Sequence, residues 1–558
     1  DVGSMNSSIA TSISDDFNFI GWACGLIVFF FLWLSLGSLE LAILSFLPMA
    51  ISWIWILGIM VILGIQFNVV NIILATFIFG QGDDYTIFMT EGCQYEYAYR
   101  RKMLSSYKNS ILVSALIMFI GMGTLITSLH PALHSLAEVT IVGMFSVVLM
   151  ACIFPPLIFK WMVADGRNYR IRPFSVIPFL VTCYSAIVFF AQLATIYILG
   201  FFLFVVFRPR RKSKAFFHRY VKRCFWLDMN RIATTRFTIH NPQNESFSKP
   251  AIVICNHQSM LDTAYLMAMT DKIAIVANEN ASQNKVIKQI FKWLDYYSIV
   301  TGDTIDESRI GQLLSNGYSV VIFPEGERNP NSSILRFHKG AFYLAERFQV
   351  DIIPLLIHGI NHIFPRNTFC AYPGEATICI GDRIRAYDYS WGKTYVERTK
   401  KVHQYYLTEY ERLRKKQETA PYFKGFVADR YRYKGIEIYT AVKKRLQNYQ
   451  AYSRWINMAS EMDSNNAIII NNGYGEFALI LALCHPGLKV FAFEIDEDKC
   501  YVAKHSAEDV AKNLIVSSDP PTDFIQEFSQ GTSPLIYLVE PNGNDEVVYQ
   551  KYNPIIIK

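Results

Sequence analysis

The stretch Ala251-Ile-Val-Ile-Cys-Asn-His-Gln-Ser-Met-Leu-Asp262 decides how the rest of the chain is interpreted. Its first five residues are apolar, which predicts a buried strand that ends at Cys255. His257 follows this strand, and Asp262 stands five residues later, where the next helix should begin. A carboxylate there can fold back, hold the proton on one ring nitrogen and leave the other nitrogen as a general base. The spacing therefore predicts that His257 and Asp262 form a catalytic pair.

A second apolar run strengthens this prediction. Ser319 to Phe323 reads as another buried strand, and it ends in Pro324-Glu-Gly-Glu-Arg328. Together with the Asn-His-(four residues)-Asp motif that begins at Asn256, this stretch resembles the PlsC-type glycerolipid (1-acylglycerol-3-phosphate) acyltransferases. The resemblance covers about residues 174–400. The chain departs from the family pattern at Glu327, where the family has Thr.

The resemblance implies a mechanism and a set of site residues. His257 would take the proton of an acceptor hydroxyl, whose oxygen attacks an acyl thioester, and Asp262 would fix the imidazole tautomer. Backbone amides at the turn after Phe323 would stabilise the oxyanion. The substrate-binding residues would be Asn256, Glu325, Gly326, Arg328 and Lys339, with Arg328 and Lys339 on an acceptor phosphate and Glu325 holding Arg328 or a backbone amide. The donor would be acyl-coenzyme A or acyl-acyl carrier protein (acyl-CoA or acyl-ACP), with no cofactor for acyl transfer.

Apolar strand candidates ending at Cys255, Val276, Phe323 and Pro354, with helical patterns between them, predict an α/β acyltransferase domain over residues 208–405. His358 and His362 stand four apart, but they follow a strand rather than lie on a clear helix. They are interpreted as structural histidines, and no metal site is predicted.

Composition places part of the chain in a membrane. The hydrophobic fraction is 52%, and the net charge of +6 is too small to indicate a nucleic-acid partner. Residues 1–165 are predicted to form five spans, near 17–39, 41–63, 69–91, 109–129 and 139–159. Basic loops around Arg100 and Arg170 should be cytoplasmic, which makes the protein a multi-pass inner (cytoplasmic) membrane protein with its acyltransferase and C-terminal domains in the cytoplasm.

A pair of adjacent acidic residues lies in or beside the third predicted span. The stretch Gly80-Gln-Gly-Asp-Asp-Tyr85 resembles the proton-relay helix of RND/MMPL-type exporters. By that resemblance Asp84 and Tyr85 match the relay pair, and Asp83 is an additional carboxylate. Intramembrane acids usually serve a proton or ion path. A complete exporter of this type has two such halves, so the missing transporter half is a possible partner. The alternative to a proton relay is that Asp83 and Asp84 are an interfacial pair at the end of a span.

Residues 174–207 carry no charge and lie between two basic segments that should both be cytoplasmic. One crossing would put these segments on opposite sides, and two crossings need about 40 residues. A hairpin that dips into the membrane, with Pro178 and Gly200 near its ends, is therefore preferred over one long tilted span.

Residues 406–460 are predicted to form a basic helical linker. Residues 461–558 contain a strand, a glycine turn with Gly473 and Gly475, and a second strand that leads to Glu494. This pattern resembles the first half of a class I methyltransferase, in which Glu494 would bind ribose hydroxyls and S-adenosylmethionine is a possible cofactor. The chain stops early for that fold, so a structural half-domain is equally open.

The predicted fold is multidomain: an α-helical membrane bundle, then an α/β acyltransferase domain, then a partial α/β Rossmann-like domain. The predicted function is membrane-bound O-acyl transfer from a thioester to a lysophospholipid-like or other lipid hydroxyl. The alternative is a lipid exporter subunit of the RND/MMPL type with an attached modifying domain.

Overall fold

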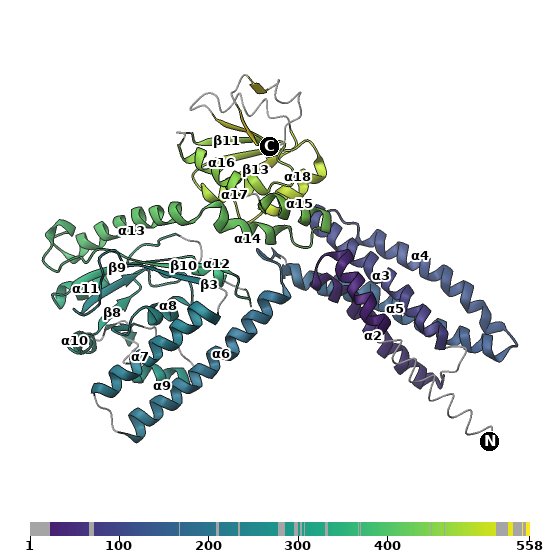
Figure 1. Ribbon diagram of the computed structural model, residues 1–558, viewed down its shortest axis with the longest axis horizontal. Helices are drawn as coiled ribbons and strands as arrows, with labels where there is room; N and C mark the ends of the chain where they lie inside the picture. Colours follow the sequence, from purple (N-terminus) through teal and green to yellow (C-terminus); the bar gives the residue numbers. More distant parts are fainter. Residues whose placement is uncertain are drawn as a thin grey trace. The chain divides into compact units, whose positions relative to one another are not determined.

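The computed structural model (Figure 1) describes residues 23–65, 72–166, 168–207, 211–232, 235–276, 285–294, 300–301, 304–305, 307–329, 333–365, 368, 370–447, 449–461, 464–519, 534–539, 549–550 and 554–557. The chain divides into two compact units. One unit is continuous and spans Val176–Tyr422, and the other combines the residues up to Ser175 with those from Phe423 onward. The continuous unit is therefore inserted between the two parts of the other.

A six-stranded sheet forms the centre of the continuous unit. Its order is β3-β10-β9-β4-β8-β5, and all neighbours are parallel except β9 and β10. The strands are β3 (Thr235–His240), β4 (Ala251–Cys255), β5 (Ile273–Ile275), β8 (Ser319–Ile322), β9 (Asp351–His358) and β10 (Gly374–Ile380). A separate two-stranded hairpin comprises β6 (Val300–Thr301) and β7 (Thr304–Ile305).

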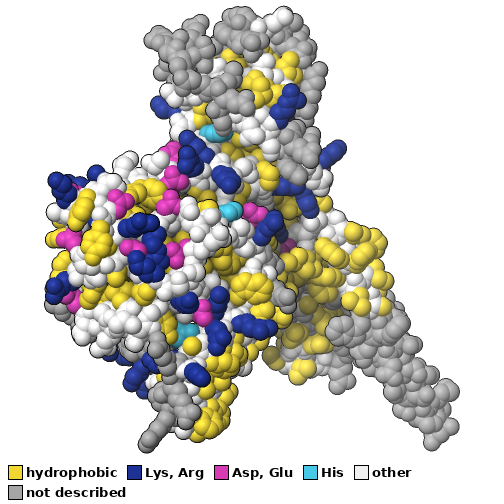
Figure 2. Space-filling view, turned by 60° about the vertical axis from the view of Figure 1, so that its left-hand side comes forward, with side chains coloured by type: hydrophobic (Ala, Val, Ile, Leu, Met, Phe, Trp, Pro, Cys, Tyr) yellow, Lys and Arg dark blue, Asp and Glu magenta, His cyan; other side chains and the backbone are white. Residues whose placement is uncertain are grey.

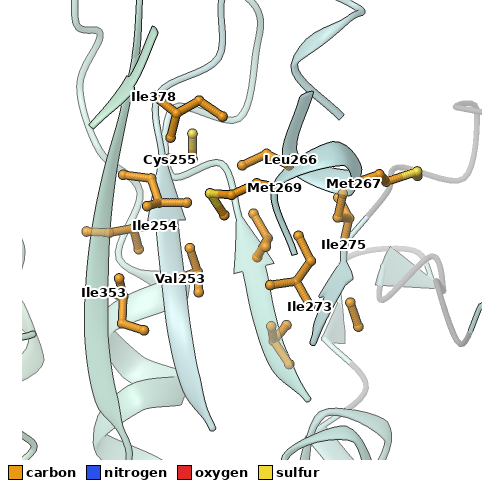
Figure 3. Close-up of a cluster of buried hydrophobic side chains, with 14 of the residues drawn as sticks. Val253, Ile254, Cys255, Leu266, Met267, Met269, Ile273, Ile275, Ile353 and Ile378 are labelled. Atoms are coloured by element: carbon orange, nitrogen blue, oxygen red, sulfur yellow. The ribbon is translucent and has the colours of Figure 1, made fainter. Parts of the chain in front are cut away.

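The central position of β4 explains its composition. Its five residues are fully buried between β8 and β9, with Ile252 in register with Val320 on one side and Ile352 on the other. A parallel strand covered on both faces needs apolar residues at every position, not at alternate ones. Figure 3 shows these side chains packed with those of β5 and the next helix, including Ile254, Ile273 and Leu266.

The helices of this unit pack around the sheet. Helix α7 packs against α8 and α6, and α11 and α13 pack against each other and against β4 and β9. The helices are α6 (Val176–Phe201, continued by the π-helical turn Phe202–Val206), α7 (Arg211–Leu227, continued by Asp228–Ile232), α8 (Asp262–Met269), α9 (Lys285–Trp293), α10 (Glu307–Ser315), α11 (Gly340–Arg347), α12 (Ile360–Ile363) and α13 (Tyr395–Gln417), with a 3₁₀ turn at Tyr389–Trp391.

The predicted strand end at Cys255 was right, and those at Val276 and Phe323 were close, because β5 and β8 each end one residue earlier. The prediction that a strand ends at Pro354 was wrong, because β9 continues to His358. Pro354 is tolerated inside this strand because the antiparallel ladder with β10 begins one residue later, at Leu355, so the ladder does not need the N–H that proline lacks.

The hairpin predicted within residues 174–207, all of which are described, is absent from the structure. A single helical segment runs from Val176 to Val206, and the chain returns in α7. Pro178 does not break α6 because it lies in the first turn, where helical N–H groups have no intrahelical acceptor. Gly200 is not a turn residue either. A Cβ atom at Gly200 would lie 2.3 Å from the ring of Trp293, so its glycine permits the close packing of α9 against α6.

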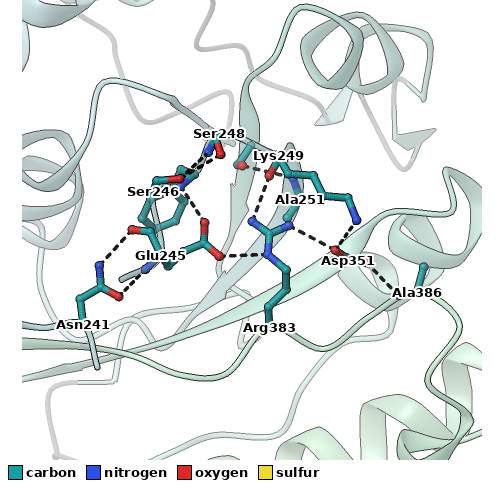
Figure 4. A network of polar contacts seen from close by, with 11 residues as sticks. Asn241, Glu245, Ser246, Ser248, Lys249, Ala251, Asp351, Arg383 and Ala386 are labelled. Atoms are coloured by element: carbon teal, nitrogen blue, oxygen red, sulfur yellow. Dashed lines mark hydrogen bonds and ion pairs between the residues drawn. The ribbon is translucent and has the colours of Figure 1, made fainter. Parts of the chain in front are cut away.

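A polar network connects residues at the end of the sheet where β4 and β9 begin (Figure 4). The Arg383 guanidinium donates to Glu245 at 2.9 Å and to Asp351 at 3.3 Å, and Lys249 donates to Asp351 at 2.9 Å. Burial alone would raise the pKa of Asp351. Hydrogen bonds from Lys249, the backbone of Ala386 and Arg383 outweigh burial and hold this pKa below its ordinary value. The network therefore stabilises the start of β9 as a charged cluster.

The first part of the other unit is a helical bundle. It contains α2 (Leu39–Leu63), α3 (Ile72–Tyr99), α4 (Leu104–Gly123, continued by Thr124–Thr127), α5 (Pro131–Val163) and a short hairpin of β1 (Ala164–Asp165) and β2 (Asn168–Tyr169). Large hydrophobic side chains are exposed on α2, α4, α5 and α6. Figure 2 shows hydrophobic patches on the surface in yellow. Within the described residues four helices are long and apolar enough to cross a membrane: Leu39–Leu63, Leu104–Thr127, Pro131–Val163 and Val176–Val206.

These helices match three of the predicted spans within residues 1–165, with ends shifted by several residues. The predicted first span begins outside the described residues. The described residues that follow include the apolar helix Ala23–Leu36. The predicted third span corresponds to α3, which is helical but carries Asp83, Asp84 and Glu91 and is not among the four.

The second part of this unit contains a parallel sheet and five helices in the described residues, three before the first strand and two between strands. The sheet order is β13-β12-β11-β14-β15. The elements are α14 (Ala420–Tyr431), α15 (Ile436–Gln447), α16 (Tyr449–Glu461), β11 (Asn466–Ile470), α17 (Glu476–Cys484), β12 (Lys489–Phe493), α18 (Glu497–Ala507), β13 (Leu514–Ser517), β14 (Leu535–Val539) and β15 (Ile555–Ile557).

Arg430 joins the two parts of this unit. Its buried guanidinium donates to the carbonyl oxygens of Ile171 at 2.8 Å, Ser506 at 2.8 Å and Glu508 at 3.0 Å. Two of these acceptors lie at the carboxyl end of α18, where unpaired carbonyl groups favour a cation.

Candidate active site

The two predicted catalytic residues are in contact. Nδ1 of His257 lies 2.7 Å from Oδ2 of Asp262. A carboxylate accepts and does not donate, so Nδ1 carries the proton and Nε2 of the neutral ring keeps a lone pair. The Asp262 side chain is fully buried, whereas 19% of the His257 side chain is exposed. The base can therefore be reached from outside while its orienting partner cannot.

The local backbone holds Asp262 in this position. Its Oδ2 also accepts the backbone N–H groups of Gln258 at 2.6 Å and Ser259 at 3.0 Å. Asp262 is the first residue of α8, where the helix dipole favours a negative charge. The five-residue spacing thus works because the loop after β4 folds around the carboxylate at the beginning of the next helix.

Asn256 was predicted to bind substrate, but the structure gives it a different place. Its side-chain amide donates to the carbonyl of Ile357 at 2.9 Å and accepts the Ile357 N–H at 2.7 Å. Only 1% of Asn256 is exposed. It closes the sheet between the ends of β4 and β9, and this fixes the backbone from which His257 projects.

Glu325 accepts hydrogen bonds from backbone N–H groups, which is one of the two roles predicted for it. One carboxylate oxygen accepts the His257 N–H at 3.0 Å, and the other accepts the Leu335 N–H at 2.9 Å. Burial raises the pKa of Glu325 to about 7, against the opposing effect of these two hydrogen bonds. Glu325 therefore joins the turn after β8 to the histidine loop.

Gly326 is required by the shape of this turn. Its φ of +75° lies in the left-handed region, and a Cβ atom there would lie 3.1 Å from the His338 imidazole. Its N–H donates to the Phe323 carbonyl at 3.2 Å within the turn. Arg328 and Lys339 are both exposed, Arg328 just after this turn and Lys339 just before α11.

Three contacts to this site were not predicted. The N–H of Asn329 donates to the His257 carbonyl at 2.8 Å, the Leu335 N–H binds Glu325, and Tyr410 contacts Gln258. Asn329 directly follows the predicted motif, so its position was a usable signal. Leu335 contributes only its backbone, and Tyr410 lies 152 residues from Gln258, so neither had a signal in sequence spacing.

The predicted proton-relay residues divide between two surfaces of α3. Asp83 and Tyr85 are buried in the bundle, whereas Asp84 is exposed. Oδ1 of Asp83 has no hydrogen-bond partner among the described residues, and the Tyr85 hydroxyl lies 3.4 Å from Ser114 Oγ of α4. The buried pair is therefore Asp83 and Tyr85, whereas the residues matched to the relay pair by the sequence resemblance are Asp84 and Tyr85.

The three residues predicted to bind a cofactor lie close together beside Arg445. Oε2 of Glu494 accepts the Gly473 N–H at 2.5 Å, and Gly475 begins α17 with a φ of +88°. A Cβ atom at Gly473 would lie 2.8 Å from the Arg445 guanidinium, which also pairs with Glu476 at 3.2 Å. The Arg445 guanidinium thus lies on the side of the turn to which a Gly473 Cβ atom would project.

The fold and this geometry define an α/β domain with a histidine–carboxylate pair at the end of a central parallel strand. Comparison with known proteins gives its class. Residues 236–358 match the model of the Acyltransferase family, and residues 2–169 match that of the MMPL family. The chain therefore contains an acyltransferase-type domain and an MMPL-type segment, which confirms two of the three resemblances drawn from the sequence. The resemblance of residues 461–558 to a methyltransferase stays a prediction.

Individual relatives agree with the first of these matches. Over 156 residues the chain is 29% identical to 1-acyl-sn-glycerol-3-phosphate acyltransferase beta of Homo sapiens. This alignment covers 27% of this chain and 56% of the human protein. Over 178 residues it is 25% identical to the chloroplastic 1-acyl-sn-glycerol-3-phosphate acyltransferase LPAT1 of Arabidopsis thaliana, which covers 31% and 49%. The chain spans about half the length of the curated relatives it matches.

A solved structure of the 1-acyl-sn-glycerophosphate acyltransferase PlsC from Thermotoga maritima aligns with 42% of this chain and 97% of that chain, at 18% identity and a TM-score of 0.37. Together, the four apolar helices and the MMPL match indicate a membrane protein.

Proposed function

We propose that this protein transfers an acyl chain from a thioester to the hydroxyl group of a lysophospholipid-like or other lipid. The observation that carries the proposal is the 2.7 Å contact between Nδ1 of His257 and the buried carboxylate of Asp262, beside the turn that contains Gly326. His257 Nε2 takes the hydroxyl proton, and the oxygen attacks the thioester carbon. The tetrahedral intermediate then expels the thiolate, and the imidazolium returns its proton to sulfur.

The partners of this reaction follow from its chemistry. The donor is a thioester of coenzyme A or of acyl carrier protein, and no further cofactor enters. The exposed cations Arg328 and Lys339 are suited to an anionic group of the acceptor or donor. The acceptor is a membrane lipid, and the reaction takes place at the inner membrane, with the α/β unit on the cytoplasmic side. Support for that orientation comes from the basic residues near Arg100 and Arg170.

The test is acyl transfer by the purified full-length protein in detergent. Labelled acyl-CoA and acyl-ACP are offered with lysophosphatidate or with a crude lipid extract, and wild type is compared with His257→Ala. Product from lysophosphatidate that the variant does not form would support a phospholipid enzyme. Product from the extract alone would keep the chemistry and assign another lipid acceptor. Absence of His257-dependent product in every mixture would overturn the proposal.

A second candidate is a lipid exporter subunit that carries the acyltransferase as a modifying domain. The match of residues 2–169 to the MMPL family favours it, and so does the buried Oδ1 of Asp83, which has no hydrogen-bond partner in the part of the chain that the structure describes. Lipid efflux from cells should then fall with Asp83→Asn and less with Asp84→Asn, while acyl transfer in detergent stays the same. Equal efflux in both variants and in wild type would argue against transport.

For residues 461–558 we propose a structural role rather than methyl transfer. Support comes from Arg445, which lies beside the Gly473 turn. Equilibrium dialysis with labelled S-adenosylmethionine should detect no binding to the full-length protein, and saturable binding would contradict this assignment.

A further inference from the structure

A buried row of polar side chains begins beside the catalytic pair and leads away from it. Nε2 of Gln258 donates to the Tyr410 hydroxyl, which lies 3.2 Å from Nδ1 of His358. Nε2 of His358 in turn lies 3.6 Å from the Glu418 carboxylate. None of these four side chains is more than 4% exposed. Bulk water therefore does not serve as their partner, and each depends on its neighbour in the row.

The chemistry of these groups gives the row one direction. An amide nitrogen only donates, so the Tyr410 oxygen accepts from Gln258 and its own proton points to His358. Burial, with smaller contributions from the charges of His362 and Arg414, lowers the pKa of His358 to about 3. The ring is neutral at any ordinary pH, so Nδ1 accepts and the single ring proton is on Nε2, facing Glu418.

The far end of the row is anchored by charge. The Arg414 guanidinium contacts both carboxylate oxygens of Glu418 at 2.8–3.0 Å. Gln258 and Tyr410 thus both donate toward the His358 ring, and Nε2 of that ring faces the fixed anion at 3.6 Å, an electrostatic contact rather than a hydrogen bond. Hydrogen bonds aligned in this way polarise one another and strengthen the row as a whole.

The near end of the row reaches the catalytic pair. The backbone N–H of Gln258 donates to Asp262 Oδ2 at 2.6 Å, and this oxygen also binds His257. Movement of the Gln258 side chain would therefore disturb the carboxylate that orients the base. We propose that Tyr410, His358 and Glu418 are positioning residues for the catalytic loop, a role that rests on the proposed acyltransferase function.

Helix α13 supplies a matched control. Tyr406 lies one turn before Tyr410 and is also fully buried. Its hydroxyl donates to the Ile254 carbonyl at 2.7 Å and accepts the Leu355 N–H at 3.0 Å, and among the described residues its hydrogen bonds go to these strands and not to Gln258. Replacing either tyrosine with phenylalanine removes one buried hydroxyl from the same helix, and only Tyr410→Phe interrupts the row.

The experiment compares kcat and KM of Tyr410→Phe and Tyr406→Phe in the full-length protein, with thermal midpoints measured in parallel. We expect Tyr410→Phe to lower kcat by about 10-fold to 100-fold, because small misplacements of a catalytic group have effects of this size, with KM for the acyl donor nearly unchanged. Tyr406→Phe should lower the thermal midpoint similarly and leave kcat near the wild-type value. Equal kcat in the two variants would overturn the inference.

A double-mutant cycle adds a measurement whose result a loss of stability alone would not change. Gln258→Leu is combined with each tyrosine variant. If Tyr410 acts through Gln258, the kcat of the Gln258→Leu/Tyr410→Phe double variant should be no lower than that of the single variant with the lower kcat. The pair with Tyr406→Phe should be additive. Additive effects in both pairs would exclude the positioning role while leaving acyl transfer itself intact. Absence of His257-dependent transfer in wild type would instead overturn the proposed function, and this inference with it.

Discussion

The ring of Phe323 stacks on the imidazole of His257, with ring centroids 4.1 Å apart and planes inclined by 21°. Phe323 directly follows β8, and His257 lies two residues after the end of β4, the neighbouring parallel strand. The imidazole is therefore fixed in two ways: the stack restrains the plane of the ring, and Asp262 holds its Nδ1 atom.

Replacing Phe323 with leucine should lower kcat by about 10-fold, because the ring loses its flat support and samples unproductive orientations. Phe323→Tyr keeps the stacked ring and should retain most of the activity. The measurement is steady-state acyl transfer with both variants. If Phe323→Leu were as active as wild type, the hydrogen bond to Asp262 would be sufficient to orient the base.

Asp262→Asn should lower kcat by about 100-fold to 10,000-fold, the range expected for losing a correctly arranged general base. The amide would present either an N–H to the Nδ1 proton or a weak neutral acceptor, and it would also lose the charge that stabilises the imidazolium. Thermal unfolding serves as the check on folding, because Asp262 also accepts two backbone N–H groups. A folded variant with wild-type kcat would contradict the assigned role of Asp262.

The raised pKa of Glu325 predicts a pH-dependent stability. In the folded protein its pKa is about 7, above the ordinary value of 4.5, so the native state holds this proton more tightly than the unfolded state. Stability from this group is present below about pH 4.5 and declines as pH rises to about 7, by up to about 3 kcal/mol.

Thermal midpoints of wild type and Glu325→Gln, measured between pH 4.5 and 8, test this prediction. The difference between the two proteins should change in favour of the variant as pH rises toward 7, and then level off. A difference that is constant over this range would mean that Glu325 does not titrate there.

The network around Arg383 predicts the opposite pH dependence at lower pH. The pKa values of Asp351 and Glu245 are both held below their ordinary values of 3.8 and 4.5. Their stabilisation is present above about pH 4.5 and is lost as pH falls through the lowered values. Asp351→Asn should therefore reduce stability at pH 7 by about 1–3 kcal/mol and lose less on acidification than wild type.

The control for this prediction is Glu375→Gln. Glu375 pairs with Arg236 at 3.8 Å, and both side chains are mostly exposed. Exposed pairs of this kind contribute little, so this variant should unfold like wild type across the pH range. A matching loss of stability in both variants would contradict the network's role.

Gly200→Ala should destabilise the continuous unit, because its methyl group would overlap the Trp293 ring. We expect a loss of about 1–3 kcal/mol, the usual cost of overpacking. Gly58 in α2 has nothing within 4 Å of a Cβ position, so Gly58→Ala should be neutral or slightly stabilising. Thermal unfolding in detergent measures both variants, and equal midpoints would mean that α9 can move away from α6 at little cost.

Sequence patterns predicted the centre of the sheet and the catalytic pair because both are local. A run of five apolar residues needs burial on two faces, and a five-residue spacing needs only one loop to bring His257 to Asp262. The end of β9 was missed because a proline usually marks a strand end. Whether it does here depends on the register with β10, which the sequence does not contain.

The other differences, and the features that the sequence did not predict, depend on contacts between distant segments. Asn256 binds Ile357, 101 residues away, and this contact turns an expected ligand-binding amide into part of the sheet. Asp83 and Asp84 are chemically alike, and only the packing of α3 against α2 and α5 decides which of them is buried. The hairpin was misplaced because charge counting gives the side of a membrane but not the residue at which a helix turns.

Arg430 has a consequence for how this chain is made. It bonds to the carbonyl of Arg170, 260 residues earlier, and to the end of α18, and so joins the bundle near the chain's start to the sheet near its end. During synthesis the first helices emerge long before this partner exists, while the inserted unit can fold as soon as Tyr422 has left the ribosome. The inserted unit should therefore be protease-resistant in nascent chains at a stage when the loop around Ile171 is still cleaved.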